Sequence, residues 1–201
     1  MNHKEKAEYY FAEELASIKN QEIKQFVFDV FEKLTPDYFW TVPCSTSGKY
    51  HPQVSLGVGG LIRHVKLAVW WGIELARAME LEQYHDEVVA ALLLHDLIKN
   101  GKGLDSNGRP LEQGVTGTHG VTLAKQIDNG FTNQLTPESR VRILDGIAGH
   151  MGIWTTDMAY RPIQEFAKLI HLADYCASRK VDAEMVELNS LVIGDSNENY
   201  L

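Results

Sequence analysis

The sequence predicts an all-α protein, a single compact helical bundle, and three observations support this prediction. Apolar residues recur at three- and four-residue intervals along most of the 201-residue chain, as they do on the buried faces of amphipathic helices. The run Thr136-Pro137-Glu138 is typical of a helix start, with a threonine N-cap and a proline in the first turn. No segment alternates apolar and polar residues convincingly enough to predict a strand.

The expected helices are separated by two long glycine-rich loops. The helices cover residues of about 4–18, 22–34, 61–80, 86–99, 118–128, 136–149, 162–179 and 182–188. Thr35-Pro36 ends the second helix, and Gly130 is a suitable end for the fifth. The loops at 41–60 and 100–117 are long for connections within a compact domain, and such loops are often functional.

The length of the chain suits one domain with a sizeable core. We expect this domain to span residues 1–201, with a core at about 56–180, N-terminal helices within 1–40 and a polar tail at 190–201. The N-terminus lacks an apolar signal core, and no apolar run approaches the roughly 18 residues of a membrane span. A cytoplasmic protein without a membrane partner is therefore expected.

The net charge of −8 argues against a broad electrostatic surface for binding duplex nucleic acid. It is compatible with a small anionic substrate, because bound metal ions would dominate the local field. The two cysteines, Cys44 and Cys176, do not form a metal-spaced pair. Free thiols are the simpler interpretation of these cysteines, and a disulfide is the alternative.

Imidazole and carboxylate side chains at six positions suggest a metal site. They are His64, His95, Asp96, His119, His150 and Asp174. Imidazole suits zinc, iron, copper and nickel, while carboxylate extends the choice toward manganese and magnesium. Six ligands are too many for one tetrahedral ion and suit two ions that share a bridging carboxylate. Such a pair of ions would make the protein a hydrolase that activates water.

Helical spacing predicts that most of these side chains point inward. His64 shares a face with apolar residues at i+4, i+7 and i+11, whereas Arg63 lies on the opposite side and is a poor candidate for a substrate contact. His95, His150 and Asp174 likewise continue apolar stripes. The remaining histidine, His119, shows no clear apolar stripe and lies at an expected helix start. An unpaired carboxylate on an apolar face would be costly, and coordination removes that cost.

Three short segments resemble the HD superfamily of metal-dependent phosphohydrolases. They are Gly59-Gly60-Leu61-Ile62-Arg63-His64, Leu94-His95-Asp96-Leu97-Ile98-Lys99 and His171-Leu172-Ala173-Asp174, in the family order of His, His-Asp and Asp. The resemblance covers residues of about 56–179 and implies a helical HD domain of the two-metal branch. The loop at 43–60 and the segment at 147–152 are also similar to parts of HD-domain 3′-to-5′ exoribonucleases.

The resemblance implies a role for each of the six residues and for one lysine. A first metal would be held by His64, His95, Asp96 and Asp174. Asp96 would bridge to a second metal that His119 and His150 complete. Lys99 matches a lysine that faces substrate phosphate, although Ile98 stands where many members have glycine. Two ions of Fe, Mn, Co, Ni or Zn are implied, with Mg as a further candidate, and Asp96 and Lys99 are the candidate catalytic residues.

The expected activity is attack of a metal-activated hydroxide on phosphorus in a nucleotide or phosphodiester, with short single-stranded nucleic acid among the candidate substrates. Further candidates for binding the substrate are Lys49 and His51, which could close over it from the long loop, and Arg179, which could meet a phosphate tail. Candidates for stacking on a base are Trp40, Tyr50 and Trp154. Two other functions stay open: a di-iron oxygenase built on the HD fold, and a non-catalytic module that binds a nucleotide through its metal site.

Overall fold

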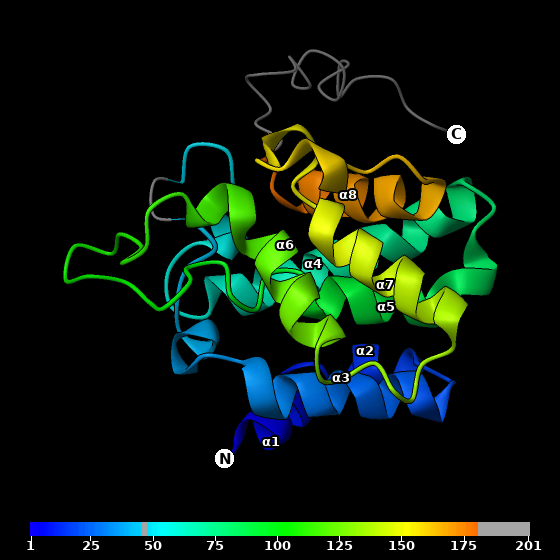
Figure 1. Ribbon diagram of the computed structural model, residues 1–201. Helices are drawn as coiled ribbons and strands as arrows, with labels where there is room; N and C mark the ends of the chain where they lie inside the picture. The colour runs from blue at the N-terminus through cyan, green and yellow to red at the C-terminus, as the bar shows by residue number, and fades with distance from the viewer. Residues whose placement is uncertain (46–47, 181–201) are drawn as a thin grey trace, which may run out of the picture.

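The computed structural model describes residues 1–45 and 48–180, and the fold of these residues is helical throughout (Figure 1). The α-helices are α1 (His3–Tyr10), α2 (Ala12–Ser17), α3 (Gln21–Leu34), α4 (Gly60–Ala78), α5 (His85–Leu94), α6 (Val115–Asp128), α7 (Pro137–Gly149) and α8 (Glu165–Ala177). Short 3-10 turns lie at Asp37–Trp40, Gln53–Ser55, Glu82–Tyr84, Gly152–Trp154 and Met158–Tyr160. These residues contain no β-strand, so the all-α prediction is confirmed. The predicted helix at 182–188 and the tail at 190–201 lie outside the described residues.

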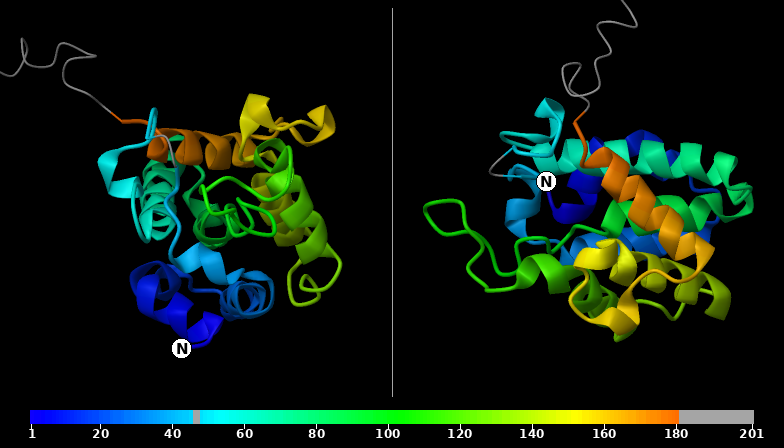
Figure 2. Two further views of the ribbon diagram at one scale, coloured as in Figure 1. Left: turned by 90° about the vertical axis from the view of Figure 1, so that its left-hand side faces the viewer. Right: turned by 90° about the horizontal axis from the view of Figure 1, so that it is seen from above.

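Helix α5 lies at the centre of the fold. Every residue of α5 from Glu87 to Leu94 is buried, as expected for a helix that is apolar on nearly all sides. Helices α4, α7 and α8 pack on one side of it and α3 on the other (Figures 1 and 2). The carboxyl end of α5 therefore opens between α4, α7 and α8, which carry most of the other candidate ligands.

The N-terminal helices form a separate aromatic part of the core. Phe11, Phe31, Phe39 and Trp40 pack together, with the Phe11 and Phe31 rings 5.7 Å apart and the Phe39 and Trp40 rings 4.9 Å apart. Phe11 also interrupts the predicted helix at 4–18, because its backbone leaves the helical region (φ −118°, ψ 30°) as its side chain becomes fully buried. The expected single helix is thus two short ones, α1 and α2.

The helix predicted at 86–99 ends earlier than its apolar pattern suggests. Helix α5 stops at Leu94, and the chain continues in tight turns in which Leu97 N–H donates to Leu94 O at 3.1 Å and Lys99 N–H to Asp96 O at 3.1 Å. These bonds span three residues rather than four, so the backbone tightens beyond the helix end. The tightened segment places His95 and Asp96 side by side at the end of α5.

The long loop at 41–60 is held against the first turn of α4. Arg63 points away from the core, as predicted, and its guanidinium donates to Val54 O at 2.5 Å and Leu56 O at 2.8 Å. Gly60 lies so close to the loop that an added Cβ would be 2.2 Å from Ser55 O. Cys44 N–H donates to Ser55 O at 3.0 Å. This packing brings Cys44 toward the inward face of α4.

The other helices agree with the sequence to within a few residues. Thr136 caps α7 as predicted, because its Oγ1 accepts from Ser139 N–H at 3.2 Å. Helix α6 begins at Val115 instead of about residue 118, after Gly114 in a left-handed conformation (φ +71°). Within the described ranges, no helix is both long enough and apolar enough to cross a membrane.

Candidate metal centre

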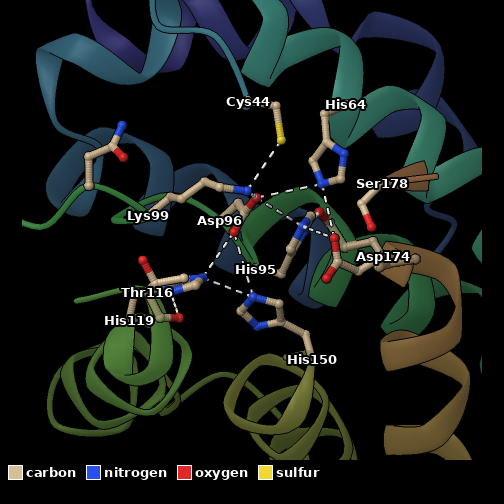
Figure 3. A network of polar contacts seen from close by, with 12 residues as sticks. Cys44, His64, His95, Asp96, Lys99, Thr116, His119, His150, Asp174 and Ser178 are labelled. Carbon is tan, nitrogen blue, oxygen red and sulfur yellow. Dashed lines mark hydrogen bonds and ion pairs between the residues drawn. The ribbon is translucent and has the colours of Figure 1, made fainter. Parts of the chain in front are cut away.

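The structure brings all six predicted metal ligands together (Figure 3). They come from five parts of the fold: α4 contributes His64, the turn after α5 contributes His95 and Asp96, α6 contributes His119, the end of α7 contributes His150, and α8 contributes Asp174. Five of the six are buried to 1% exposure or less, and the Asp174 side chain is 13% exposed. A concentration of polar groups this deep in a core requires a compensating partner.

Asp96 divides the ligands into two groups, because its two carboxylate oxygens face different histidines. Oδ2 lies 3.5 Å from Nε2 of both His64 and His95. Oδ1 lies 3.0 Å from His119 Nε2 and 3.6 Å from His150 Nε2. We call His64, His95, Asp96 and Asp174 the first group, and Asp96, His119 and His150 the second group. Asp96 is thus placed to bridge two ions.

Asp174 completes the first group from α8. Its Oδ1 lies 3.0 Å from His64 Nε2 and 3.6 Å from His95 Nε2. Metal–nitrogen and metal–oxygen bonds of about 2.0–2.2 Å place neighbouring ligands about 2.8–3.6 Å apart around one ion. The separations in both groups therefore suit an ion at the centre of each.

Hydrogen bonds to the backbone fix the orientation of three of the histidines. Nδ1 of His95 lies 2.6 Å from Leu92 O, that of His119 lies 2.9 Å from Thr116 O, and that of His150 lies 2.7 Å from Ile147 O. A carbonyl oxygen can only accept, so each Nδ1 carries a proton and each neutral ring presents the lone pair of Nε2. This arrangement is typical of metal-ligating histidines.

The Nε2 atoms of the second group then face each other in an arrangement that requires a positive charge. His119 Nε2 and His150 Nε2 are 2.9 Å apart. Two lone pairs at this separation repel each other unless a proton or a metal ion lies between them or beside them. Burial lowers the pKa of His150, which disfavours the proton. A metal ion that accepts both lone pairs satisfies the pair.

The first group contains buried ring nitrogens that face carboxylate oxygens without a hydrogen bond of good geometry. His64 Nε2 and His95 Nε2 form no such bond among the described residues, although Asp174 Oδ1 lies 3.0 Å from the former and 3.6 Å from the latter. Buried polar atoms without partners are rare in folded proteins and each one calls for an explanation such as a bound ion. Together with the ligand chemistry, these atoms indicate that the first group also fits a divalent metal.

In the metal-free protein, protons take the place of the metal charge. Burial disfavours the charged ring of His95, but Asp96 and Asp174 outweigh it and raise its pKa to about 9. Burial likewise opposes the ionisation of Asp96, whose pKa is held well below its ordinary value mainly by Lys99 and His95. The centre therefore favours positive charge between its carboxylates.

Lys99 lies against the centre, as the sequence predicted. Its Nζ donates to Asp96 Oδ2 at 2.8 Å and to Cys44 Sγ at 3.2 Å. Ile98, in the position where glycine is common in the HD superfamily, is buried and does not prevent this placement. Lys99 also lines the adjoining cavity, so a modest rotation of its side chain could direct Nζ to a bound anion.

Cys44 is a component of the site that sequence reasoning missed. Burial opposes ionisation of its thiol, but His64 and Lys99 outweigh it and lower its pKa to about 5. The only sequence signal is a cysteine and a histidine, Cys44 and His51, in one glycine-rich loop. Both Cys44 and Cys176 are free thiols, in agreement with the simpler expectation.

A cavity of about 590 Å³ opens over the metal centre. This volume lies within the range of about 300–1,000 Å³ that is common for small-molecule sites. The wall of the cavity includes the ligands His119 and Asp174, and Lys99. It also includes two of the three candidate substrate-binding residues, His51 and Arg179. The third one, Lys49, is exposed beside Tyr50 and is absent from this wall.

The predicted base-stacking residues separate into two kinds. Trp40 is 4% exposed and packs in the aromatic core, so it cannot meet a substrate. Tyr50 and Trp154 line the cavity and are about half exposed. Trp154 stacks on Tyr175 with ring centroids 6.1 Å apart and 10° between planes, and the Arg179 guanidinium lies 4.3 Å from the centre of the Tyr175 ring.

His171 lies at the edge of the site, in keeping with a packing or supporting role. Its Nδ1 donates to His150 O at 2.7 Å, which ties α8 to the end of α7.

Comparison of the chain with protein families, with curated proteins and with solved structures finds no match. The description of the site therefore rests on its geometry.

Proposed function

We propose that this protein is a metal-dependent phosphohydrolase that acts on a nucleotide or a phosphodiester. The observation that carries the proposal is the arrangement of Asp96, whose two oxygens face two histidine groups at the base of a cavity, with the Lys99 ammonium beside it. Ligand sets that share a carboxylate are typical of enzymes that use two ions for phosphoryl chemistry.

The donor set limits the choice of ion and its contribution. Four imidazoles and two carboxylates suit Fe, Mn, Co, Ni or Zn. Bound ions would supply activated water and neutralise the charge of the phosphoryl oxygens. Asp96 would set the separation of the ions at about 3.5–4 Å, as in other sites with two metals.

The residues around the cavity suit a phosphorylated ligand with an aromatic part. Lys99 Nζ is the cation next to the carboxylates and would hold a non-bridging phosphate oxygen. Arg179 provides a second cation at the cavity wall. The exposed face of Trp154 offers a stacking surface for a base, and such stacking contributes about 1–3 kcal/mol. A nucleotide would use all three contacts at once.

The test is a panel of phosphate monoesters and diesters assayed with Mn²⁺, Fe²⁺, Co²⁺, Ni²⁺ and Zn²⁺ under anaerobic conditions. It includes deoxynucleotides, dinucleoside polyphosphates, cyclic dinucleotides and short single-stranded RNA. We expect metal-dependent hydrolysis, measured as phosphate release from monoesters and as formation of the cleaved nucleotides from diesters, and we expect its loss in His119→Ala. His85→Ala is the matched control, because His85 lies at the start of α5 and contacts Ser17 on α2. Tight nucleotide binding without turnover under every condition would contradict the proposal.

A further inference from the structure

Cys44, His51 and His64 form a third group of ligand-type side chains next to the metal centre. Cys44 Sγ and one ring nitrogen of each histidine all lie within 4.8 Å of one another. Cys44 and His51 come from the loop at 41–60, and His64 comes from α4. Neither Cys44 nor His51 belongs to the first or the second group, so this group adds two donors that the proposed hydrolysis does not use as ligands.

Cys44 and His64 are buried and His51 is partly exposed, and the group can be reached from the cavity. Cys44 is 5% exposed and the His64 ring is fully buried, with Asp174 Oδ1 3.0 Å from its Nε2. Cys44 and His51 both line the 590 Å³ cavity. The His51 and His64 rings lie 5.9 Å apart at 60° to each other, so they can approach a common point from two directions. An ion could therefore enter from the cavity and meet all three side chains.

We propose that Cys44, His51 and His64 form an additional binding site for a thiophilic divalent cation of the zinc class. Thiolate is a soft ligand that selects such ions, whereas the first and second groups contain only imidazole and the harder carboxylate. A tetrahedral zinc ion holds sulfur and nitrogen ligands about 3.3–3.6 Å apart, so small movements of the loop suffice to close the group. The fourth position faces the cavity and is open to solvent.

Binding at this thiol site opposes the catalytic arrangement. His64 belongs both to the thiol site and to the first group, so an ion in the thiol site competes for it. The Lys99 ammonium, 3.2 Å from Cys44 Sγ, must also leave before a cation can approach the sulfur. An ion in the thiol site is therefore inhibitory. This inhibitory role rests on the proposed function, whereas the binding of the ion at the thiol site is independent of that function.

Cobalt titration of the full-length, reduced, metal-free protein tests the site without an activity assay. Co²⁺ bound to a thiolate gives an intense near-ultraviolet charge-transfer band, which imidazole and carboxylate ligands do not give. We expect the band in the wild type and in the matched control Cys176→Ser, and its loss in Cys44→Ser. The variant His51→Gln changes a partly exposed loop residue and should weaken the cobalt affinity measured by the band about 10-fold. Lys99→Met should strengthen that affinity, because it removes the competing ammonium.

Several results would overturn the proposal. The proposal is wrong if the folded wild type lacks the band. It is also wrong if the band is lost in Cys176→Ser and retained in Cys44→Ser. An unchanged band affinity in His51→Gln would remove His51 from the site, and this variant decides the matter if Cys44→Ser unfolds. For the inhibitory role, Co²⁺ in excess of two equivalents should reduce phosphohydrolase activity in the wild type and in Cys176→Ser. Full activity with the thiolate band present would overturn inhibition and leave the ion site established.

Discussion

Two buried polar clusters lie toward opposite ends of α5, with Glu87 in its first turn and Asp96 just beyond its last residue, and they differ in how their charges are compensated. In the first, Glu87 Oε1 accepts from Ser139 Oγ and from Arg142 Nη2, both at 2.8 Å, and joins α5 to α7. In the second, the metal centre, Asp96 faces four histidine Nε2 atoms. A carboxylate that faces donors is a finished structural contact, whereas one that faces nitrogen lone pairs is incomplete without an added cation.

This difference teaches that burial of charge alone does not identify a functional site. Glu87 is 7% exposed and Asp96 is 1% exposed, so both carboxylates are removed from solvent. Both clusters adjoin a cavity, but among the described residues only the carboxylate of the metal centre faces histidine ring nitrogens. The direction in which the hydrogen-bonding groups around a buried carboxylate point is therefore the informative observation.

The largest expected effect follows Asp96→Ala, which removes the carboxylate shared by the two groups. Loss of bridging and of charge compensation for Lys99 should lower phosphohydrolase activity by on the order of 10³-fold, equivalent to about 4 kcal/mol. Metal content, measured by elemental analysis after anaerobic purification, should fall below one ion per chain. Asp145→Ala, on an exposed position of α7, is the control and should retain activity. Retained activity in folded Asp96→Ala would refute the assignment.

Removal of Arg142 should instead affect stability and leave metal binding intact. Arg142→Ala leaves Glu87 buried with one donor fewer. Breaking such a pair lowers the free energy of unfolding by about 2–4 kcal/mol. The lower end of this range allows for the 25% exposure of the Arg142 side chain. Urea unfolding should show the loss as a lower midpoint with an unchanged slope. Two ions per chain should still bind. A loss of metal from folded Arg142→Ala would show that the two clusters are coupled.

The pH dependence of stability should also separate the metal-free protein from the metal-loaded one. His95 has a pKa raised from 6.5 to about 9, so its contribution to stability is complete below pH 6.5 and is lost as the pH rises through about 9. The lowered pKa of the Cys44 thiol, about 5, acts in the opposite sense over this range, so the comparison is made in Cys44→Ser, where the metal-free protein should lose on the order of 1–2 kcal/mol. The loaded protein should not, because its rings are already neutral ligands. Thermal unfolding midpoints measured from pH 6.5 to 9 test this, and parallel curves for the two forms would contradict it.

Within the described residues, helical periodicity was sufficient to predict the helical regions, although not every boundary, and the inward direction of most ligands. His64 lies within α4, and His150 directly follows α7 with helical backbone angles (φ −56°, ψ −32°), so their direction follows from residue spacing. The position of His119 was less predictable, because α6 starts three residues earlier than expected, after a left-handed Gly114. The tightened turn that aligns His95 with Asp96 was also missed, since apolar periodicity does not report three-residue hydrogen bonds.

Residues in loops could not be placed from the sequence. Cys44 reaches the centre because its backbone bonds to Ser55 and the loop packs on α4, and these are tertiary contacts between distant residues. Trp40 was a candidate for stacking on a base but is buried among Phe31 and Phe39, which propensity and spacing do not reveal. Side chains outside regular helices take their positions from tertiary packing.

The smallest expected effect tests the contact between α6 and α7 that sets the second group. A Cβ on Gly120 would lie 2.6 Å from Ile147 O and 2.9 Å from His150 Nδ1, so Gly120→Ala must move the two helices apart by a few tenths of an ångström. This movement separates His119 from His150 and should weaken binding of the second ion about 10-fold, or about 1.4 kcal/mol, while binding of the first ion is unchanged. Calorimetric titration with Mn²⁺ resolves the two affinities. Gly130→Ala is the matched control, because nothing lies within 4 Å of an added Cβ there. Equal weakening of the binding of both ions in Gly120→Ala would contradict this prediction. It would mean that the two groups respond as one unit through Asp96, because the contact between His119 and His150 acts directly on the second group alone.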